Sequence, residues 1–69
     1  MSERKPETSS AMVRRMAEGV FESRAIALKW LEHPNKALGG EVPSKLLGSS
    51  EGRRRVYQVL AKIEAGDFS

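Results

Sequence analysis

The stretch over residues 30–47, WLEHPNKALGGEVPSKLL, constrains the fold more than any other part of the chain. Pro34 must end the helix before it, because proline lacks an N–H group and biases the preceding residue away from helical geometry. Gly39 and Gly40 supply positions where φ can be positive or where another backbone can approach closely. Pro43 suits the first position of a new helix, where its missing N–H costs nothing. The sequence therefore predicts two helices joined by a closely specified loop.

The length of the chain limits what it can bury. A chain of 69 residues forms one domain at most, and a domain of about 60 residues buries only about 60% of the surface that its unfolded chain exposes. The sequence has no cysteine, so neither a disulfide nor a thiolate metal site reinforces the core. It has no apolar run of about 18 residues and no signal-peptide core, so we expect a soluble, cytoplasmic protein without a membrane span. Stability must come from helical packing, from oligomerisation or from a partner.

Apolar residues recur at helical spacing along most of the chain. Residues 1–9 are polar and lack this periodicity, and we interpret them as a disordered arm before a helical domain over residues 10–69. The predicted fold class is all-α, with three main helices and one short helix. The predicted helices cover residues 11 to about 22 after a cap at Ser9 or Ser10, residues 24–32 after a cap at Ser23, residues 43 to about 47, and the stretch from a cap at Ser49 or Ser50 to a stop at Gly66.

Two features of these helices predict how they pack. The helix over residues 24–32 is apolar around more than half of its circumference, which favours a central position with other helices on two sides. Gly52 lies on the apolar stripe of the last helix, where a side chain would hold that helix away from its neighbour, and Gly19 indicates either a close contact or an early end of the first helix. The residues expected at the centre of the core are Ile26, Trp30, Leu31, Leu38, Val56, Leu60 and Ile63.

Residues that could carry chemistry are sparse. His33 is the only histidine, and neither a cysteine nor clustered carboxylates accompany it at metal-ligand spacing. No serine is placed with His33 and an acid as a catalytic nucleophile requires. The Gly39–Gly40 pair lacks the longer glycine pattern and the lysine of a phosphate-binding loop. We therefore predict a protein that is not an enzyme and that has no metal site and no cofactor.

The charges of the chain permit an acidic partner. Twelve basic residues are interleaved with nine acidic ones, which leaves a formal net charge of +3. Arg53, Arg54 and Arg55 fan around the start of the last helix, where each exposed cation opposes the helix dipole by about 0.3 to 1 kcal/mol. Such a run more commonly forms a solvated helix face, yet its position is easier to understand if an acidic surface meets the arginines, and nucleic acid is one candidate. A small basic helical DNA-binding protein is accordingly one hypothesis.

A second hypothesis comes from a longer pattern. The run PNKALGGEVPSKLL, followed by SSEGRRRV and then by LAKIEAGDF, resembles the toxin-binding domain of Xre/ParS-type antitoxins over about residues 11–69. In that family a helix that ends in Trp-Leu leads into a Pro-Asn-x-x-Leu-Gly-Gly-x-x-Pro loop, and a Glu-Gly pair opens the last helix. The helix-turn-helix of longer members has no counterpart here, so we expect weak DNA binding or none. The resemblance implies an antitoxin-like module that binds and occludes a RES-domain toxin, an NAD-consuming enzyme, so any NAD chemistry would belong to the partner.

The residues expected to contact the partner lie in the loop, at the start of the last helix and after its end. Gly66 frees the last three residues from the helix, and the resemblance places them near the active-site mouth of the toxin. There the ring of Phe68 would fill an apolar pocket, unless it folds back onto the domain's own helices. A homo-oligomer is a further expected assembly. The predicted contact residues are Lys36, Gly39, Gly40, Arg53, Arg54, Asp67, Phe68 and Ser69.

Overall fold

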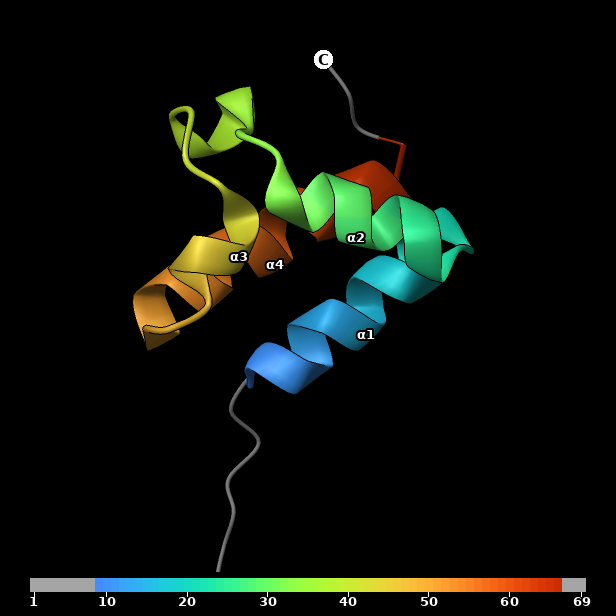
Figure 1. Cartoon of the computed structure of the whole chain (residues 1–69), viewed down its shortest axis with the longest axis horizontal. Coiled ribbons are helices and arrows are strands. Elements are labelled where there is room, and N and C mark those ends of the chain that lie inside the picture. The colour runs from blue at the N-terminus through green and yellow to red at the C-terminus, as the bar shows by residue number, and fades with distance from the viewer. Residues whose placement is uncertain (1–8, 67–69) are drawn as a thin grey trace, which may run out of the picture.

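Helices make up nearly all of the regular structure in residues 9–66, the part of the chain that the computed structural model describes (Figure 1). The elements in this part are α1 (Ser10–Phe21), α2 (Arg24–Glu32), the 3₁₀-helix η1 (Lys36–Leu38), α3 (Pro43–Leu46) and α4 (Ser50–Glu64). The predicted all-α fold with three main helices and one short helix is confirmed. The predicted arm lies outside the described residues apart from Ser9, and so do Asp67, Phe68 and Ser69.

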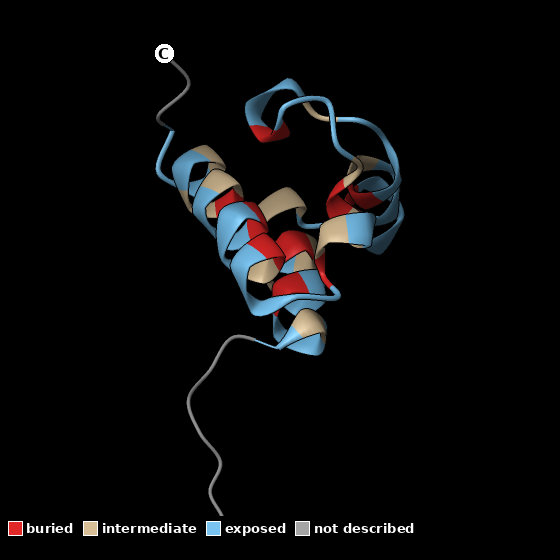
Figure 2. Ribbon diagram, turned by 90° about the vertical axis from the view of Figure 1, so that its left-hand side faces the viewer, coloured by how far each residue is buried: buried red, intermediate tan, exposed pale blue. Residues whose placement is uncertain are grey.

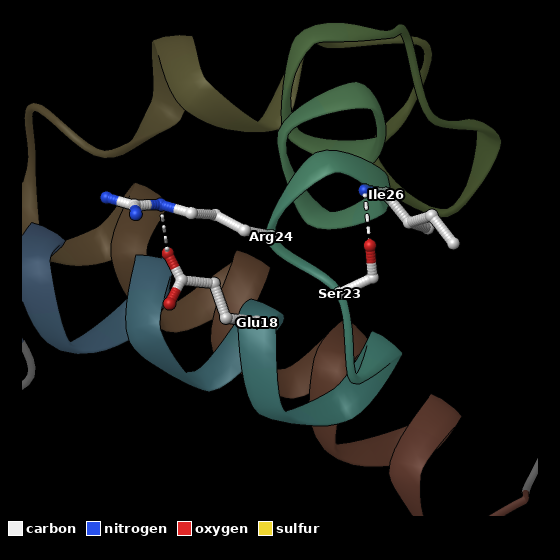
Figure 3. Close-up of polar contacts among 4 residues, drawn as sticks. All are labelled: Glu18, Ser23, Arg24 and Ile26. Carbon is white, nitrogen blue, oxygen red and sulfur yellow. Dashed lines mark hydrogen bonds and ion pairs between the residues drawn. The ribbon is translucent and has the colours of Figure 1, made fainter.

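Serine side chains begin the three long helices. Ser9, Ser23 and Ser49 each accept a hydrogen bond from the backbone N–H three residues later, at 3.2, 3.2 and 3.0 Å. Figure 3 shows this bond between Ser23 and Ile26. Each cap satisfies one of the N–H groups that a first helical turn leaves unpaired, and removing such a cap typically costs about 1 kcal/mol. The predicted cap at Ser23 is confirmed, and Ser9 and Ser49 act at the other two starts.

The turn between α1 and α2 is short and left-handed. Glu22 has φ 54°, and across the turn the Arg24 Nε lies 3.7 Å from a Glu18 carboxylate oxygen (Figure 3). Both side chains are well exposed, so this ion pair contributes at most about 1 kcal/mol. Helix α1 continues through Gly19, and in the described part of the chain no atom of another element lies within 4 Å of the place where its Cβ would be. The expectation that Gly19 marks a close contact or an early end was therefore wrong.

The core lies where α1 meets its neighbours. Helix α1 packs against both α2 and α4, α2 packs against α1 and α3, and α4 also contacts α3 and η1. Figure 2 shows the buried residues along the inner sides of these elements. Helix α1, rather than α2, thus has a long helix on either side. The buried hydrophobic residues are Val13, Ala17, Ala27, Leu31, Leu38, Leu47, Val56 and Leu60.

The position of α2 corrects part of the expected core. Ile26 is 53% exposed, so its assignment to the centre was wrong. At about 100° per residue, Ile26 projects roughly 100° away from Ala27, which faces the core. Trp30 is half-buried beside the ring of Phe21, with ring centroids 5.7 Å apart, and Ile63 is also half-buried. The apolar arc of α2 is wider than the surface that α1 and α3 cover. The other four expected residues, Leu31, Leu38, Val56 and Leu60, are buried.

Gly52 is the point at which α3 and α4 approach each other. A Cβ at this buried position would overlap the backbone carbonyl oxygen of Leu46 and lie 2.8 Å from its carbonyl carbon. The predicted role of Gly52 in letting a neighbour come close is confirmed. The close approach also brings Leu47, the last buried residue of the α3 turn, beside the first turn of α4.

Candidate functional site

The loop between α2 and α3 is closed by hydrogen bonds to one residue, Asn35. Its N–H donates to the Glu41 carbonyl at 3.0 Å, and its own carbonyl accepts from the N–H groups of Leu38 and Gly40 at 2.9 and 2.8 Å. The Asn35 side chain accepts from the Ala37 N–H at 2.8 Å. A side chain that bonds to backbone two residues later is a common turn former. The loop therefore holds its shape through its own bonds.

The tip of this loop presents backbone and one cation to solvent. Gly39 and Gly40 have φ values of 68° and 84°, and both are exposed together with Lys36. The left-handed conformation favours glycine, since other residues lose about 1 to 2 kcal/mol there. Leu38 points the other way and is buried, and its carbonyl accepts a bond of 3.4 Å from the Arg55 side chain on α4. The loop is thus anchored to α4 by one apolar and one polar contact.

Two of the three consecutive arginines bond to backbone carbonyls of this domain. The half-buried Arg53 donates from Nη1 to the carbonyl of Leu47 at 3.0 Å, at the end of α3, and Arg55 reaches the carbonyl of Leu38, at the end of η1. Carbonyls at helix C-termini lack intrahelical partners and carry partial negative charge. These contacts offset the opposition to the dipole of α4, so the arginine run does not by itself require an acidic partner. Arg54 is exposed.

A groove of about 790 Å³ lies between the loop and the C-terminal half of α4. In both views, the loop and the C-terminal end of α4 lie toward the upper side of the molecule (Figures 1 and 2). Among residues 9–66, apolar side chains provide half of the lining, and two cations but no acidic residue take part. The predicted contacts omitted both cations. The lining residues are Asn35, Ala37 and Leu38 from the loop and Arg55, Tyr57, Gln58, Val59, Ala61, Lys62 and Ile63 from α4.

The predicted contact residues do not form a single small cluster. Lys36, Gly39 and Gly40 lie together on the loop, whereas Arg53 and Arg54 lie near the first turn of α4. About 15 Å of helix, at 1.5 Å per residue, separates Arg54 from Glu64, the last residue of α4, and the predicted contacts at 67–69 lie outside the described residues. A partner that touched all of these positions would have to cover the length of α4. The spacing of Arg55, Val59 and Lys62 at helical periodicity was the sequence signal that could have revealed the groove.

Residues 9–66 contain no group of three or more His, Cys, Asp or Glu side chains that could hold a metal ion. His33 lies at the end of α2, where its Nδ1 is 2.7 Å from the carbonyl of Lys29. A histidine that donates to one of the last carbonyls of a helix stabilises that helix end. Within the same range, no helix combines the length and apolar character that crossing a membrane requires.

Comparison with known proteins gave a family and two relatives. The family model described as the antitoxin Xre/MbcA/ParS C-terminal toxin-binding domain matches residues 16–66, which include the loop, the groove and all of α4. The chain is 33% identical over 57 residues to antitoxin Xre of Pseudomonas putida strain KT2440, an alignment that covers 83% of this chain and 36% of the relative. It is 50% identical over 45 residues to 6-hydroxy-3-succinoylpyridine 3-monooxygenase HspA of Pseudomonas putida strain S16, covering 65% of this chain and 14% of that protein.

The chain therefore spans well under half the length of each of these curated relatives. No solved structure matches it.

Proposed function

This chain belongs to the antitoxin Xre/MbcA/ParS C-terminal toxin-binding domain family, and we propose that it acts as an antitoxin module that binds and occludes a RES-domain toxin. The observation that carries the proposal is the family match, which runs through the closed loop and α4. The choice of a RES-domain toxin rests on the resemblance of the PNKALGGEVP segment and the helix after it. The toxin would supply the NAD chemistry, and this chain would supply a surface that covers its active site.

The loop geometry supports a binding role. Because Asn35 already closes the loop, little conformational entropy would be lost when a partner binds it. Gly39 and Gly40 have no side chains, so a partner backbone can come close to the loop tip. Lys36 lies beside them and offers a charge for a toxin carboxylate. We therefore retain Lys36, Gly39 and Gly40 as proposed toxin contacts.

The remaining proposed contacts lie along α4 and beyond it. Arg54 is exposed and could meet an acidic toxin surface, whereas Arg53 is half-buried and donates to the carbonyl of Leu47, so its proposed contact is the weaker of the two. Asp67, Phe68 and Ser69 remain proposed contacts at the active-site mouth of the toxin. We also propose a cytoplasmic location for the complex, where NAD is available to the toxin, and self-association through the half-exposed side chains of Met12, Ile26 and Leu28.

The alternative of a DNA-binding protein is less well supported by the geometry. Arg53 and Arg55 bond to carbonyls of their own domain, which reduces their reach toward phosphates. A footprint of one or two phosphate contacts gives only weak, sequence-independent binding, whose logarithm falls with the logarithm of salt concentration at a slope of only about −1 to −2. Sequence-selective duplex binding by this chain at physiological ionic strength would contradict the antitoxin proposal.

Co-expression with a RES-domain toxin encoded beside this chain tests the proposal. The chain should co-purify with the toxin and should prevent the loss of cellular NAD and the arrest of growth. Lys36→Glu should weaken the complex, whereas Lys29→Glu, an equal charge change at an exposed position of α2, should not. Continued NAD loss in the presence of a folded, abundant chain would refute the proposal for that toxin.

A further inference from the structure

We propose that the groove between the loop and α4 binds an extended acidic segment of the partner protein, in which one apolar residue lies between two carboxylates. The segment would belong to the toxin, so this inference rests on the proposed function. It names the chemistry of the toxin surface that the groove would recognise. A peptide probe can test the groove without any toxin, which keeps the two proposals separable.

The two cations of the groove set the spacing of the carboxylates. Arg55 and Lys62 are exposed and lie seven residues apart on α4, which places them about 10.5 Å apart along the helix axis and within about 20° around it. Val59 lies between them on the same face. Arg55 uses Nη2 for the Leu38 carbonyl, and a guanidinium has five N–H donors, so donors remain for a carboxylate. One carboxylate would meet each cation.

The apolar lining selects the residue between the carboxylates. Side chains of an extended chain alternate between two faces and advance about 3.3 Å per residue, so residues i, i+2 and i+4 face the same way and span about 13 Å. The flexible ends of arginine and lysine can cover the difference from the 10.5 Å spacing. The pattern that fits is acidic, any, apolar, any, acidic. Its central side chain would contact the apolar lining, which consists of Ala37, Leu38, Val59, Ala61 and Ile63.

The lining favours a protein segment over a nucleic acid. Nucleic acids are held through several phosphate contacts and by base stacking on aromatic rings. The groove offers two cations and the ring of Tyr57, and half of its lining is aliphatic. Asn35, Tyr57 and Gln58 add polar groups that can pair with a peptide backbone. The volume of about 790 Å³ is within the range of about 300 to 1,000 Å³ that binding clefts have.

The test is a titration of the full chain into a fluorescein-labelled peptide, GESLSEG, followed by fluorescence anisotropy. We expect saturable binding with a Kd below about 1 mM that weakens with salt. Lys62→Glu should weaken binding about tenfold, since repulsion replaces an exposed attraction. Arg15→Glu makes the same charge change at an exposed position of α1, outside the groove, and should change the Kd less than twofold. Melting curves would verify that each variant is folded.

Several results would overturn the proposal. These are no saturation at about 1 mM peptide, equal weakening by Arg15→Glu and Lys62→Glu, or equal affinity for GESSSEG, which lacks the apolar residue. If duplex DNA displaces the peptide, and Lys62→Glu weakens DNA binding as much as it weakens peptide binding, the groove would be assigned to nucleic acid. If deletion of residues 67–69 raises the affinity for the peptide more than tenfold, the groove would be assigned to the chain's own C-terminal residues. A concentration-dependent dimer that Lys62→Glu dissociates would assign it to a second copy.

The proposed function has separate outcomes. Retained toxin neutralisation by a Lys62→Glu variant that no longer binds the peptide would refute the assignment of the segment to the toxin but leave the antitoxin proposal intact. Peptide binding by a chain that neutralises no RES-domain toxin would refute the proposed function and leave the peptide specificity of the groove intact.

Discussion

Gly19 and Gly52 form a matched pair for substitution by alanine, with opposite expected effects on stability. Both lie in long helices, Gly19 near the end of α1 and Gly52 in the first turn of α4. Within residues 9–66, a Cβ at Gly19 would meet no atom of another element within 4 Å, whereas a Cβ at Gly52 would overlap the backbone carbonyl of Leu46. The comparison therefore separates the helix propensity of alanine from the steric contact between α3 and α4.

The magnitudes follow from these surroundings. Gly19→Ala should stabilise the fold by about 0.5 to 1 kcal/mol, because alanine loses less backbone entropy than glycine in a helix. Gly52→Ala gains up to the same stability from helix propensity, but overpacking costs about 1 to 3 kcal/mol. The cost should be at the upper end, because the added Cβ meets the backbone carbonyl of Leu46, which cannot rotate away as a side chain can. A cost of about 3 kcal/mol less a gain of about 1 leaves a net loss of about 2 kcal/mol. With about 4 to 8 °C per kcal/mol, Tm should fall by about 8 to 16 °C for Gly52→Ala and rise by about 2 to 8 °C for Gly19→Ala.

Thermal and urea unfolding followed by far-UV circular dichroism would measure both changes. The double variant should show the sum of the two, since the sites lie on different elements and share no contact in residues 9–66. A Gly52→Ala variant with a Tm at or above that of the parent chain would refute the packing of α3 on α4 through this glycine. A lower Tm for Gly19→Ala would show that α1 has a contact at that position.

Other substitutions test the loop, the core and the C-terminal end. Leu38→Ala should cost about 2 to 5 kcal/mol in urea unfolding, because it removes the buried anchor of the loop. Trp30→Ala should cost less than the 3 to 5 kcal/mol typical of a buried tryptophan, since its ring is half-buried. Gly40→Ala should cost about 1 to 2 kcal/mol because its φ is 84°. Deleting residues 67–69 should leave Tm nearly unchanged but weaken toxin neutralisation; a much lower Tm would instead place Phe68 in the core.

The bounds of the helices could be predicted because local groups determine them. Helix α2 runs over the predicted residues, Arg24–Glu32, since the Ser23 side chain caps its start and Pro34 prevents its continuation. The order of packing could not be predicted in the same way. Hydrophobic periodicity shows how wide the apolar face of a helix is, and α2 has the widest apolar face. Which helix lies between two others depends on close approach, and the small buried side chain of Ala17 is consistent with such an approach to α1.

The candidate site was predictable to a similar, limited extent. Positive φ values were predicted as possible at Gly39 and Gly40, and both residues have them; Leu38 is buried, as its place in the predicted core requires. The bonds of Asn35 were not anticipated, because several closed conformations suit the same residues. The directions of Arg53 and Arg55 were also out of reach, since the carbonyls that they meet come from other elements.

The contacts of Leu38 and Arg55 make stability and binding inseparable at those two positions. Leu38 is buried between the loop and α4, and its carbonyl receives the bond from Arg55, so a change at either residue moves the loop that shapes the groove. A loss of partner binding there would not show direct contact. Lys36 on the loop and Lys62 on α4 are both exposed, and Lys62 lines the groove. Replacing either lysine removes a charge without removing a core side chain. These two lysines are therefore the positions at which lost binding with unchanged melting would report on the interface itself.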